Sequence, residues 1–467
     1  MKIYNTLENR KVEFVPQQEG RVKIYVCGPT VYNYFHMGNA RPFVVFDTIR
    51  RYLEFRGYDV NFVQNFTDVD DKIINKARED GVTAGEVSEK YIEEYYKDAA
   101  ALNVMKATAH PKVTEHMDDI IQFVKNLVDA GYAYEVNGDV YYSTKKFKSY
   151  GKLSGQNTDD LESGKRIEVD DDKRDPLDFA LWKARKENDE IAWDSPWGMG
   201  RPGWHIECST MSRKYLGDTL DIHAGGQDLI FPHHENEIAQ SEAHNGKQFA
   251  NYWMHNGYIT IDKEKMSKSK GNFFTVRDIL KDYDGEVIRF FLLSGHYRNP
   301  INFSKDLMEQ AKSALARMRN TKENLRHLIN TQTGKMMESE KATAEGFDRH
   351  RQIFIDKMDD DLNTADAITA IFELVSDINH AIKDGCSGEF AEVALAALQE
   401  PADVLGLLQD RQGAGSGIGA DIEALVEERQ EARKRKDFAR ADRIRDQLAA
   451  RGITLKDTPQ GVQIIEN

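Results

Sequence analysis

Cysteine is scarce in this chain of 467 residues, which contains only Cys27, Cys208 and Cys386. Disulfide-stabilised secreted domains use many paired cysteines, so an odd and sparse set excludes that class and is typical of a reducing cytosol. Long apolar runs are also missing, and a membrane-spanning helix needs about 18 or more such residues. The first residues lack the apolar core of a signal peptide. We therefore expect a cytoplasmic protein, with no membrane partner, whose thiols act individually.

An excess of positive charge is absent too. The formal net charge of −15 excludes a protein that coats nucleic acid indiscriminately. A local basic stripe can still supply phosphate contacts, so a specific RNA partner is compatible with this charge. Hydrophobic residues make up 40% of the chain, which is enough for packed cores, and the length predicts three or more domains.

Two short strings carry most of the chemical information. The first, HMGN at residues 36–39, follows an apolar strand predicted at 22–26 and precedes a helix predicted over 43–53. A strand, a tight turn and a helix N-terminus together form an anion site, because backbone N–H groups point toward the ligand. The second string, KMSKS at residues 265–269, places two lysines on a small segment that can close over phosphate.

The chain between these strings has the pattern of a nucleotide-binding fold. A second strand at 60–66 completes the first half of a parallel sheet, with its ligand crevice at the carboxyl ends of the strands. Residues 72–130 are predicted to be mainly helical. A hairpin over 132–142, turning at Asn137-Gly138, and the irregular charged sequence up to 200 then indicate an insertion.

The second half of the fold resumes at about 204. A short strand is predicted at 220–223, followed by a glycine turn at 224–228 and then by helices from 277 to 408. Glycine-rich sequence at 412–419 is the clearest linker. Beyond it we predict one charged helix over 421–451 and a small hairpin.

These patterns predict an α/β chain with several parts. A Rossmann-type parallel-sheet catalytic domain spans 1–275 and contains an insertion at about 105–203. The parts after it are connecting helices over 276–305, a helical bundle over 306–410, a linker over 411–420 and a small C-terminal module over 421–467.

Four side chains form a candidate metal site: Cys27, Cys208, His233 and Glu237. His233 and Glu237 are four residues apart, so on a helix they share one face. Two thiolates, an imidazole and a carboxylate are competent zinc ligands, but these converge only if the fold brings its strand ends together. The alternative is that both cysteines are ordinary buried thiols and that His233 merely begins a helix.

The two strings resemble the HIGH and KMSKS motifs of class I aminoacyl-tRNA synthetases. Residues 25–32, 203–209 and 223–237 are similar to cysteinyl-tRNA synthetases, and the resemblance covers essentially the whole chain. It implies activation of L-cysteine with ATP, release of pyrophosphate and transfer of cysteine to the 3′ end of tRNA(Cys). It also implies one catalytic Zn²⁺ per chain, held by the four side chains named above, with His234 as an outer partner.

A zinc ion suits this chemistry because cysteine must be distinguished from serine. A hydrophobic pocket rejects near-isosteres poorly, whereas zinc binds a thiolate far better than a hydroxyl. We expect Cys27, Thr67, Trp204 and His223 to line the substrate pocket. Thr67 can hold the amino group of the substrate, and the alternative for Trp204 is a place in the core. No editing domain is expected.

The activation step depends on positioning and on stabilisation of spread negative charge. His36 and Asn39 can donate to phosphate oxygens, and Lys265 and Lys268 can neutralise the departing pyrophosphate. The expected ATP-binding residues are Thr30, His36, Gly38, Asn39, Asp228 and Lys268. Asn39 replaces the histidine of the HIGH motif, and its amide still donates a hydrogen bond. Mg²⁺ is expected with ATP, although the sequence shows no site for it. The alternative for residues 265–270 is a solvated basic loop.

The C-terminal part is basic although the chain is acidic. Residues 429–456 contain ten lysines and arginines against four acids. The resemblance favours contact with the anticodon stem or loop, whereas the alternative is a solvated helix with many ion pairs. RNA readers stack unpaired bases on aromatic rings, and Phe438 is the only aromatic residue there. We expect a monomer.

Three other functions compete with tRNA charging by cysteine. A ligase that couples cysteine to an amino-sugar shares the activation site, but such relatives lack the C-terminal module. Methionine activation fits less well, because metal ligands inside the substrate crevice suit a thiol. An inactive relative that binds RNA, or senses metal or thiol, conflicts with the intact His36, Lys268 and ligand set.

Overall fold

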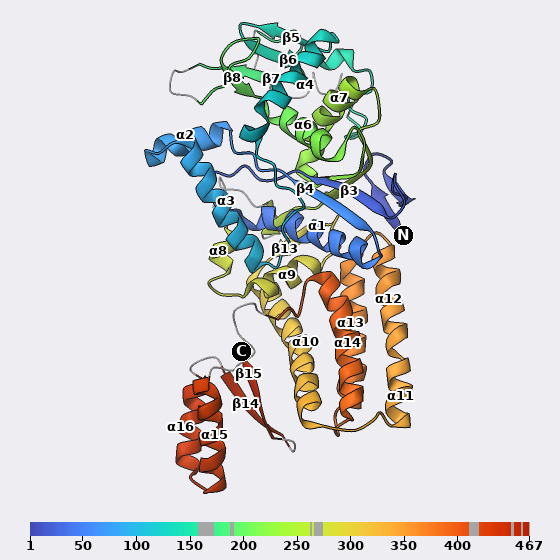
Figure 1. Ribbon diagram of the computed structural model, residues 1–467, viewed down its shortest axis with the longest axis vertical. Coiled ribbons are helices and arrows are strands. Elements are labelled where there is room, and N and C mark those ends of the chain that lie inside the picture. The colour runs from blue at the N-terminus through green and yellow to red at the C-terminus, as the bar shows by residue number, and fades with distance from the viewer. Residues whose placement is uncertain are drawn as a thin grey trace. The chain divides into compact units, whose positions relative to one another are not determined.

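The computed structural model describes residues 1–156, 172–186, 191–261, 264–265, 274–410, 420–449, 453–458 and 461–466 (Figure 1). These residues form two compact units. The first is Met1–Met308 with Lys357–Ala365, and the second is Glu309–Asp356 with Asp366–Asn467. The predicted metal ligands all lie in the first unit.

A four-stranded parallel sheet forms the centre of the first unit, as predicted. Its order is β10-β9-β3-β4, and every neighbouring pair is parallel. The strands are β3 (Arg21–Val26), β4 (Asp59–Gln64), β9 (Leu220–Gly226) and β10 (Ala250–Asn256). After β3 the chain adds β4 on one side of the central pair, and after β9 it adds β10 on the opposite side. The strand order therefore reverses between β3 and β9, and at such a switch point the ligand crevice lies at the carboxyl ends of the strands.

Strand β9 is longer than predicted, and the expected glycine turn at 224–228 is wrong. The strand continues through Gly226, which pairs with Asn256 of β10. A Cβ on Gly225 would lie 2.8 Å from Leu229 Cδ1 and 3.1 Å from His234 Cε1. The glycine therefore allows close packing of a strand against the segment that follows it.

Helices follow the strands and carry some of the predicted functional residues, among them Cys208 in α6 and Glu237 in α7. The helix predicted over 43–53 is α1, which begins six residues earlier, at Met37. Those of the first unit are α1 (Met37–Phe55), α2 (Asp71–Asp80), α3 (Ala84–Ala101), α6 (Trp204–Leu216), η3 (Gln227–Leu229), η4 (Ile230–His234), α7 (Glu235–Asn245), α8 (Val276–Ile279) and α9 (Gly285–Leu293). An N-terminal hairpin is formed by β1 (Lys2–Asn5) and β2 (Arg10–Glu13).

The predicted insertion contains its own antiparallel sheet, in the order β5-β6-β7-β8. Its elements are η1 (Val113–His116), α4 (Met117–Asp129), β5 (Ala133–Val136), β6 (Asp139–Tyr142), η2 (Thr144–Lys146), β7 (Phe179–Ala184) and β8 (Gly200–Pro202). The hairpin turns at Asn137 and Gly138, as predicted, and both have positive φ, of 55° and 88°. This conformation suits a two-residue hairpin loop.

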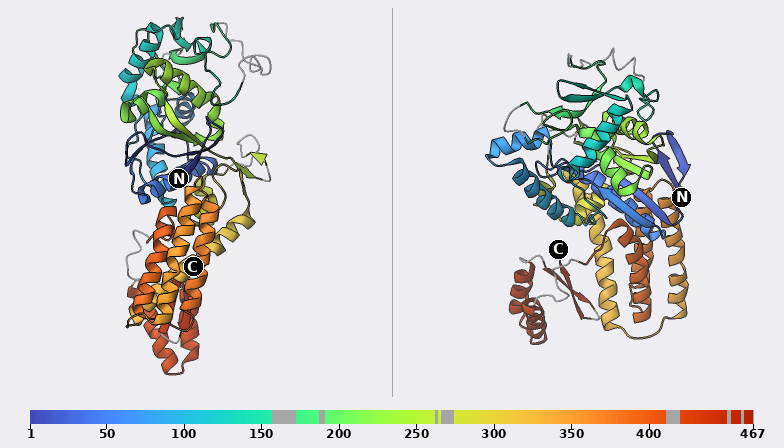
Figure 2. Two further views of the ribbon diagram at one scale, coloured as in Figure 1. Left: turned by 90° about the vertical axis from the view of Figure 1, so that its right-hand side faces the viewer. Right: turned by 45° about the horizontal axis from the view of Figure 1, so that its top comes forward.

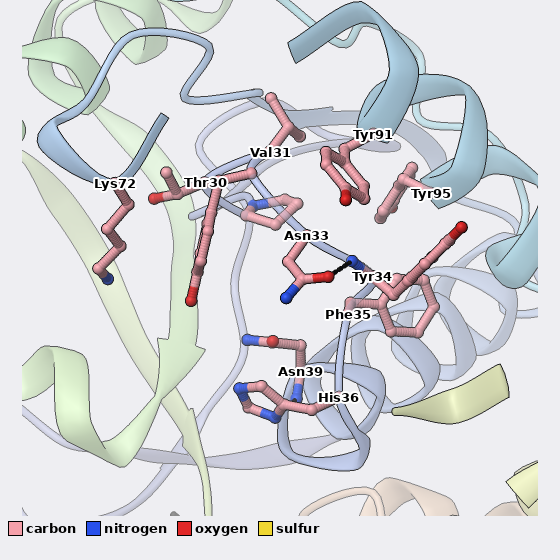
Figure 3. A pocket seen from close by; sticks show the side chains of 12 residues that line it. Thr30, Val31, Asn33, Tyr34, Phe35, His36, Asn39, Lys72, Tyr91 and Tyr95 are labelled. Carbon is pink, nitrogen blue, oxygen red and sulfur yellow. Dashed lines mark hydrogen bonds between the residues drawn. The ribbon is translucent and has the colours of Figure 1, made fainter. Parts of the chain in front are cut away.

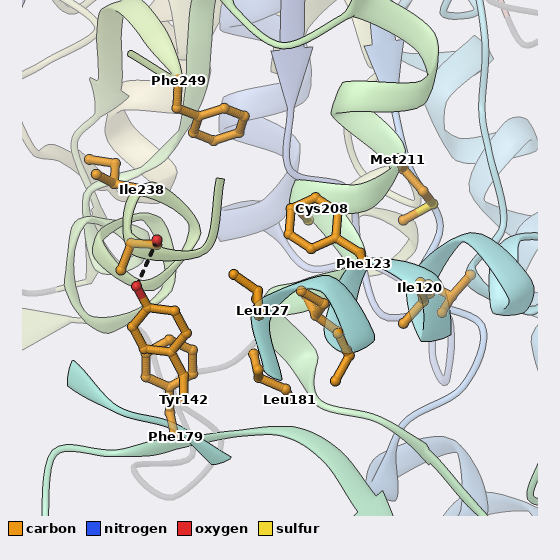
Figure 4. Close-up of a cluster of buried hydrophobic side chains, with 14 of the residues drawn as sticks. Ile120, Phe123, Leu127, Tyr142, Phe179, Leu181, Cys208, Met211, Ile238 and Phe249 are labelled. Carbon is orange, nitrogen blue, oxygen red and sulfur yellow. Dashed lines mark hydrogen bonds between the residues drawn. The ribbon is translucent and has the colours of Figure 1, made fainter. Parts of the chain in front are cut away.

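One hydrophobic core joins the insertion to α6 and α7, the helices that carry Cys208 and Glu237. Phe123 of α4 and Leu181 of β7 belong to the same buried cluster as Cys208 and Met211 of α6 and Ile238 of α7 (Figure 4). The insertion therefore packs directly behind the helices that present the candidate ligands, and its core supports their positions.

The first unit also contains a small second sheet. It has the order β12-β11-β13, formed by β11 (Ile259–Ile261), β12 (Glu264–Lys265) and β13 (Ile301–Phe303). Strand β13 interrupts the region predicted as helices over 277–408. It pairs in parallel with β11, so long-range backbone pairing decides its conformation.

The second unit is mainly helical (Figure 2). Its bundle uses α10 (Lys305–Thr331), α11 (Glu338–Glu345), α12 (Phe347–Asp359), α13 (Thr364–Ala381) and α14 (Gly388–Leu405). The C-terminal module contains α15 (Ala420–Lys434), α16 (Phe438–Ala449), β14 (Ile453–Thr458) and β15 (Gly461–Glu466). The hairpin is confirmed, but the single helix predicted over 421–451 is wrong. Lys436 adopts a positive φ of 62° and separates two helices.

No helix among the described residues is both long and apolar enough to cross a membrane.

Candidate active site and metal centre

The four predicted metal ligands lie together at the carboxyl edge of the sheet. Cys27 directly follows β3, Cys208 lies in α6, His233 lies in η4 and Glu237 lies in the first turn of α7. Their donor atoms all lie within 4.8 Å of one another. Zinc binds its ligands at about 2.0–2.3 Å, so donors this close can surround one ion. That they bind a metal stays a prediction.

A second set of donors overlaps the first one. Cys27, His223, His234 and Glu237 also place one donor atom each within 4.8 Å of the others. His234 Nε2 lies 3.3 Å from Cys27 Sγ, and His223 Nε2 lies 2.8 Å from Glu237 Oε2. The two sets share Cys27 and Glu237. The first set contains two sulfur donors, which suit a soft metal better than one does.

The electrostatics of the cluster favour a cation. Burial would raise the pKa of Glu237, but His223 and His233 bring it to about 2. Burial would lower the pKa of His233, yet Glu237 and Cys208 raise it to about 10. Burial raises the pKa of Cys27, whereas a hydrogen bond from Cys27 lowers that of Cys208. The Glu237 carboxylate and the Cys208 thiolate are thus stabilised by protons on neighbouring side chains. A divalent cation can take the place of these protons.

Two histidine pairs hold the imidazole rings in place, and His233, His234 and His255 in them are buried. His205 Nδ1 lies 2.9 Å from His233 Nδ1, and His234 Nδ1 lies 2.8 Å from His255 Nε2. His255 Nδ1 in turn lies 2.8 Å from the Thr6 hydroxyl. Burial lowers the pKa of His205, His234 and His255 and so favours the neutral form of each ring. Partners of this kind fix which ring nitrogen faces a metal.

The predicted pocket residues have different environments. The Trp204 ring is 42% exposed, which makes the core alternative wrong, and its centroid lies 4.3 Å from that of His233. Thr67 is buried and its hydroxyl donates to Glu207 Oε2 at 2.9 Å. His223 is fully buried and stacks on Trp253 with centroids 4.6 Å apart. Trp204 can therefore contact a ligand, whereas the buried His223 contacts the Glu237 carboxylate and helps to hold it in place.

His36 and Asn39 line a pocket at the start of α1 (Figure 3). His36 caps the helix, and its Nδ1 accepts from the Asn39 backbone N–H at 3.2 Å. The pocket has a volume of about 140 Å³, and Thr30, Tyr32 and Lys72 also line it. An aromatic ring, amide groups and a lysine beside a helix N-terminus form a suitable environment for a phosphate-bearing ligand.

The structure describes some of the remaining residues predicted to bind ATP. Gly38 lies in the first turn of α1, and Asp228 is exposed in η3. Lys265 lies in β12, where its backbone pairs with Thr260. Lys268 lies outside the described residues.

Backbone hydrogen bonds join the HIGH-like segment to the segment that begins at 274. Met37 N donates to Phe274 O at 3.2 Å, and Val276 N donates to Phe35 O at 3.1 Å. Residues 35–37 therefore form a fixed contact with the chain that follows the KMSKS-like string.

Several residues near the site were missed by sequence reasoning. Asn65 Oδ1 lies 3.7 Å from Cys208 Sγ and accepts from the Gly28 backbone N–H at 2.9 Å. Glu207 is fully buried, and burial raises its pKa well above the usual value. Glu207 directly precedes Cys208, so its place in the motif was the one available signal. Nothing in the local sequence marks Asn65, because its contacts with Gly28 and Cys208 are long-range.

The C-terminal module is both basic and rich in ion pairs. Arg435 pairs with Glu431 at 3.2 Å, and Arg440 pairs with Glu428 at 2.8 Å. The alternative of a helix with many ion pairs therefore describes part of this surface. Phe438, however, is 61% exposed at the start of α16, where a base can reach its ring.

Comparisons with known proteins agree with this geometry. The sequence model of the class I (C) tRNA synthetase catalytic domain matches residues 13–313, and that of the DALR domain matches 353–409. The model of the cysteinyl-tRNA ligase anticodon binding domain matches 415–464. A cysteine–tRNA ligase of Clostridioides difficile (strain 630) is 60% identical over 464 residues, covering 99% of both chains.

Solved structures share the fold at low identity. A Mycobacterium tuberculosis methionyl-tRNA synthetase in complex with methionyl-adenylate has a TM-score of 0.58 at 14% identity, covering 82% of this chain and 89% of that one. The Agrobacterium radiobacter K84 agnB2 LeuRS, in a ternary complex with tRNA and LeuAMS, has a TM-score of 0.60 at 11% identity, covering 84% and 85%.

The parallel sheet, the two motif strings and these likenesses define a class I aminoacyl-tRNA synthetase with a Rossmann-type catalytic domain. Within that class, the 60% identity along the full chain and the matched anticodon binding domain both point to enzymes for cysteine. The chain belongs to the cysteinyl-tRNA synthetase family.

Proposed function

We propose that this chain is a cysteine–tRNA ligase, which forms cysteinyl-adenylate from L-cysteine and ATP and then charges tRNA(Cys). The observation that carries the proposal is the convergence of Cys27, Cys208, His233 and Glu237 at the carboxyl edge of the sheet. Cys27 is only nine residues before His36. The candidate metal centre and the candidate phosphate site are thus at the two ends of one short segment.

The donor set fits one Zn²⁺ per chain. When bound, zinc supplies a soft acceptor that favours the thiolate of cysteine over the hydroxyl of serine. The protein orients its ligands through outer contacts: His205 touches His233, and His223 contacts Glu237. Trp204 is exposed beside His233 and can cover a small substrate. Thr67 and Glu207 form a buried polar pair. In this proposal Thr67 holds the amino group of the cysteine substrate.

ATP binds, in this proposal, against the N-terminus of α1 with Mg²⁺. His36, Gly38 and Asn39 supply donors, and Thr30 lines the same pocket as His36. Lys265 and Lys268 neutralise the pyrophosphate, and Asp228 accepts from the ribose hydroxyls. These groups act by position and charge, which is the main source of catalysis in phosphoryl chemistry.

The second unit binds tRNA in this proposal. The matched anticodon binding domain and the exposed Phe438 support contact with RNA. The same module argues against coupling of cysteine to an amino-sugar, a reaction that needs no anticodon contact. A monomer remains our proposal for the oligomeric state, and the scarcity of cysteine supports a cytoplasmic location. We also propose that the chain divides into domains at the boundaries that its sequence predicts.

Amino-acid-dependent exchange of pyrophosphate into ATP tests this function. Cysteine should support exchange by the metal-loaded protein, while serine and methionine should not, and tRNA(Cys) should then be charged. An absence of exchange with cysteine would sink the proposal. Exchange without charging would favour the amino-sugar reaction, and exchange with methionine would favour that rival.

A further inference from the structure

Arg41 is a fully buried cation in helix α1, five residues after His36. Its Nη1 donates to the carbonyls of Gly257 and Tyr258, both at 2.8 Å. Its Nη2 donates to the carbonyl of His296 at 3.2 Å. One planar guanidinium thus joins α1 to two other chain segments.

This arrangement is costly for a protein interior. No carboxylate pairs with Arg41 among the described residues, and its Nε atom has no hydrogen-bond partner there. Burial lowers its pKa to about 10. Arg289 is equally buried but pairs with Asp47 at 2.6 Å. Buried charges are normally compensated by a partner, so the carbonyl contacts of Arg41 are its whole compensation.

The bonded carbonyls lie where the small sheet begins. Gly257 and Tyr258 directly precede β11, which pairs with β12 on one side and β13 on the other. Gly257 N donates to Tyr297 O at 2.8 Å. A Cβ on Gly257 would lie 2.6 Å from the Asn299 carbonyl, so no side chain fits at this junction. The backbone there is tightly confined, and Arg41 is the side chain that ties it to α1.

We propose that Arg41 is a positioning residue for adenylate formation. It holds the β11–β12 arm, which carries Lys265, at a fixed place relative to the helix start that carries His36 and Asn39. The inference rests on the proposed function, because it assumes that both places act on ATP. Misplacement of reacting groups by about 1 Å costs on the order of 100-fold in rate, so one such tie can control the chemical step.

The test compares Arg41→Lys with the matched control Arg289→Lys in the full-length, zinc-loaded protein. Lysine keeps the charge but loses the planar fork. Cysteine-dependent pyrophosphate exchange in Arg41→Lys should show kcat lowered by about 10- to 100-fold. KM for cysteine and zinc content should stay within about twofold of the wild type, because an interaction with the transition state was removed. Arg289→Lys should lower the unfolding midpoint and leave kcat within about twofold.

A double-variant cycle with Lys265→Ala separates positioning from general stability. If Arg41 acts by placing Lys265, then Arg41→Lys should add little loss in the Lys265→Ala background. If the fold-losses in kcat of the two single variants multiplied fully in the double variant, the inference would be overturned. A wild-type kcat in Arg41→Lys, full activity in Lys265→Ala, or equal losses in the Arg289 control would also overturn it.

Arg41→Gln provides a second variant, should the lysine variant not fold. It keeps an amide donor and removes the buried charge, so it tests the carbonyl contacts at lower burial cost. It should show the same loss of kcat with normal zinc content, and a kcat equal to that of the wild type would count against the inference. The wild type is the reference for the proposed function: no exchange there contradicts the function, whereas normal exchange in all Arg41 variants contradicts only the inference.

Discussion

The Nε2 atom of His233 lies 3.1 Å from Oε1 of Glu237, four residues further along the chain. This contact crosses the junction of η4 and α7, so one local segment supplies two donors to the candidate metal centre. The two sulfur donors come from distant segments, Cys27 after β3 and Cys208 in α6.

Replacement of Cys208 by serine should abolish metal binding and cysteine activation together. The hydroxyl is a poor zinc ligand, so the loss should exceed the roughly 10- to 100-fold that removal of an outer partner causes. Bound zinc and cysteine-dependent pyrophosphate exchange measure both effects, and circular dichroism checks the fold. Cys386→Ser is the matched control, because Cys386 is a buried thiol in the second unit. Full activity in a zinc-free Cys208→Ser preparation would show that the metal centre is misassigned.

Two histidine variants should distinguish the overlapping donor sets. His233→Asn should lose zinc, whereas His223→Asn should keep it with affinity weakened by about 10- to 100-fold, as expected for an outer partner. Zinc affinity is measured by competition with a chelator. The reverse order of the two effects would favour the set that contains His223 and His234.

Phe438→Ala should weaken binding of tRNA and spare formation of the adenylate. Stacking of a base on an aromatic ring contributes about 1–3 kcal/mol, so the Kd for tRNA should rise accordingly. Phe438→Tyr keeps the ring and is the control, which should bind as the wild type does. If deletion of residues 421–467 impaired pyrophosphate exchange as much as charging, a separate RNA-binding module would be ruled out.

Because of His110, the free energy of unfolding of the first unit should fall in mild acid. Its Nε2 accepts from the Ala107 backbone N–H and its Nδ1 lies 3.0 Å from Gln64 O, so the folded protein holds the neutral ring. Burial lowers its pKa from 6.5 to about 4. Between these values the unfolded chain binds the proton and the folded chain does not, so stability falls as pH decreases through this window, by up to about 3 kcal/mol.

Unfolding midpoints of wild type and His110→Gln, measured from pH 7 to pH 4, check this prediction. The difference between the two proteins isolates His110 from the other buried histidines, and it should shrink as the pH falls. A difference that is constant with pH would contradict the assigned protonation state.

Asp361 should contribute strongly to stability in the first unit. Its carboxylate is fully buried, accepts from Tyr297 Oη at 2.9 Å and from the Tyr4 backbone N–H at 2.8 Å, and pairs with Arg298 at 2.7 Å. Asp361→Ala removes the acceptor of two donors, Tyr297 Oη and the Tyr4 N–H, and unpairs the partly exposed Arg298. A loss of about 1–3 kcal/mol is therefore expected from denaturant unfolding. The neighbouring exposed Asp360 pairs with surface Lys11, and Asp360→Ala should cost at most about 1 kcal/mol.

Local patterns were sufficient for much of the fold. The apolar runs at 22–26 and 60–66 become β3 and β4, and Asn137-Gly138 turns the hairpin of the insertion. Errors occurred where long-range contacts compete with local preference. Glycines at 225 and 226 read as a turn but continue β9, because the strand pairs with β10 along its length. Strand β13 forms within a helical region, because β11 offers it a partner.

By itself, the sequence determined the order of the elements and the identity of the chemistry-bearing residues, since periodicity and motif spacing are local properties. Which of those residues meet was decided only by the tertiary structure. The pairing of β3 with β9 brings Tyr25 beside His223, and this closure creates a histidine cluster with two possible donor sets. Residues such as Asn65, Glu207 and Arg41 have meaning only through partners far along the chain, and no local pattern encodes those partners.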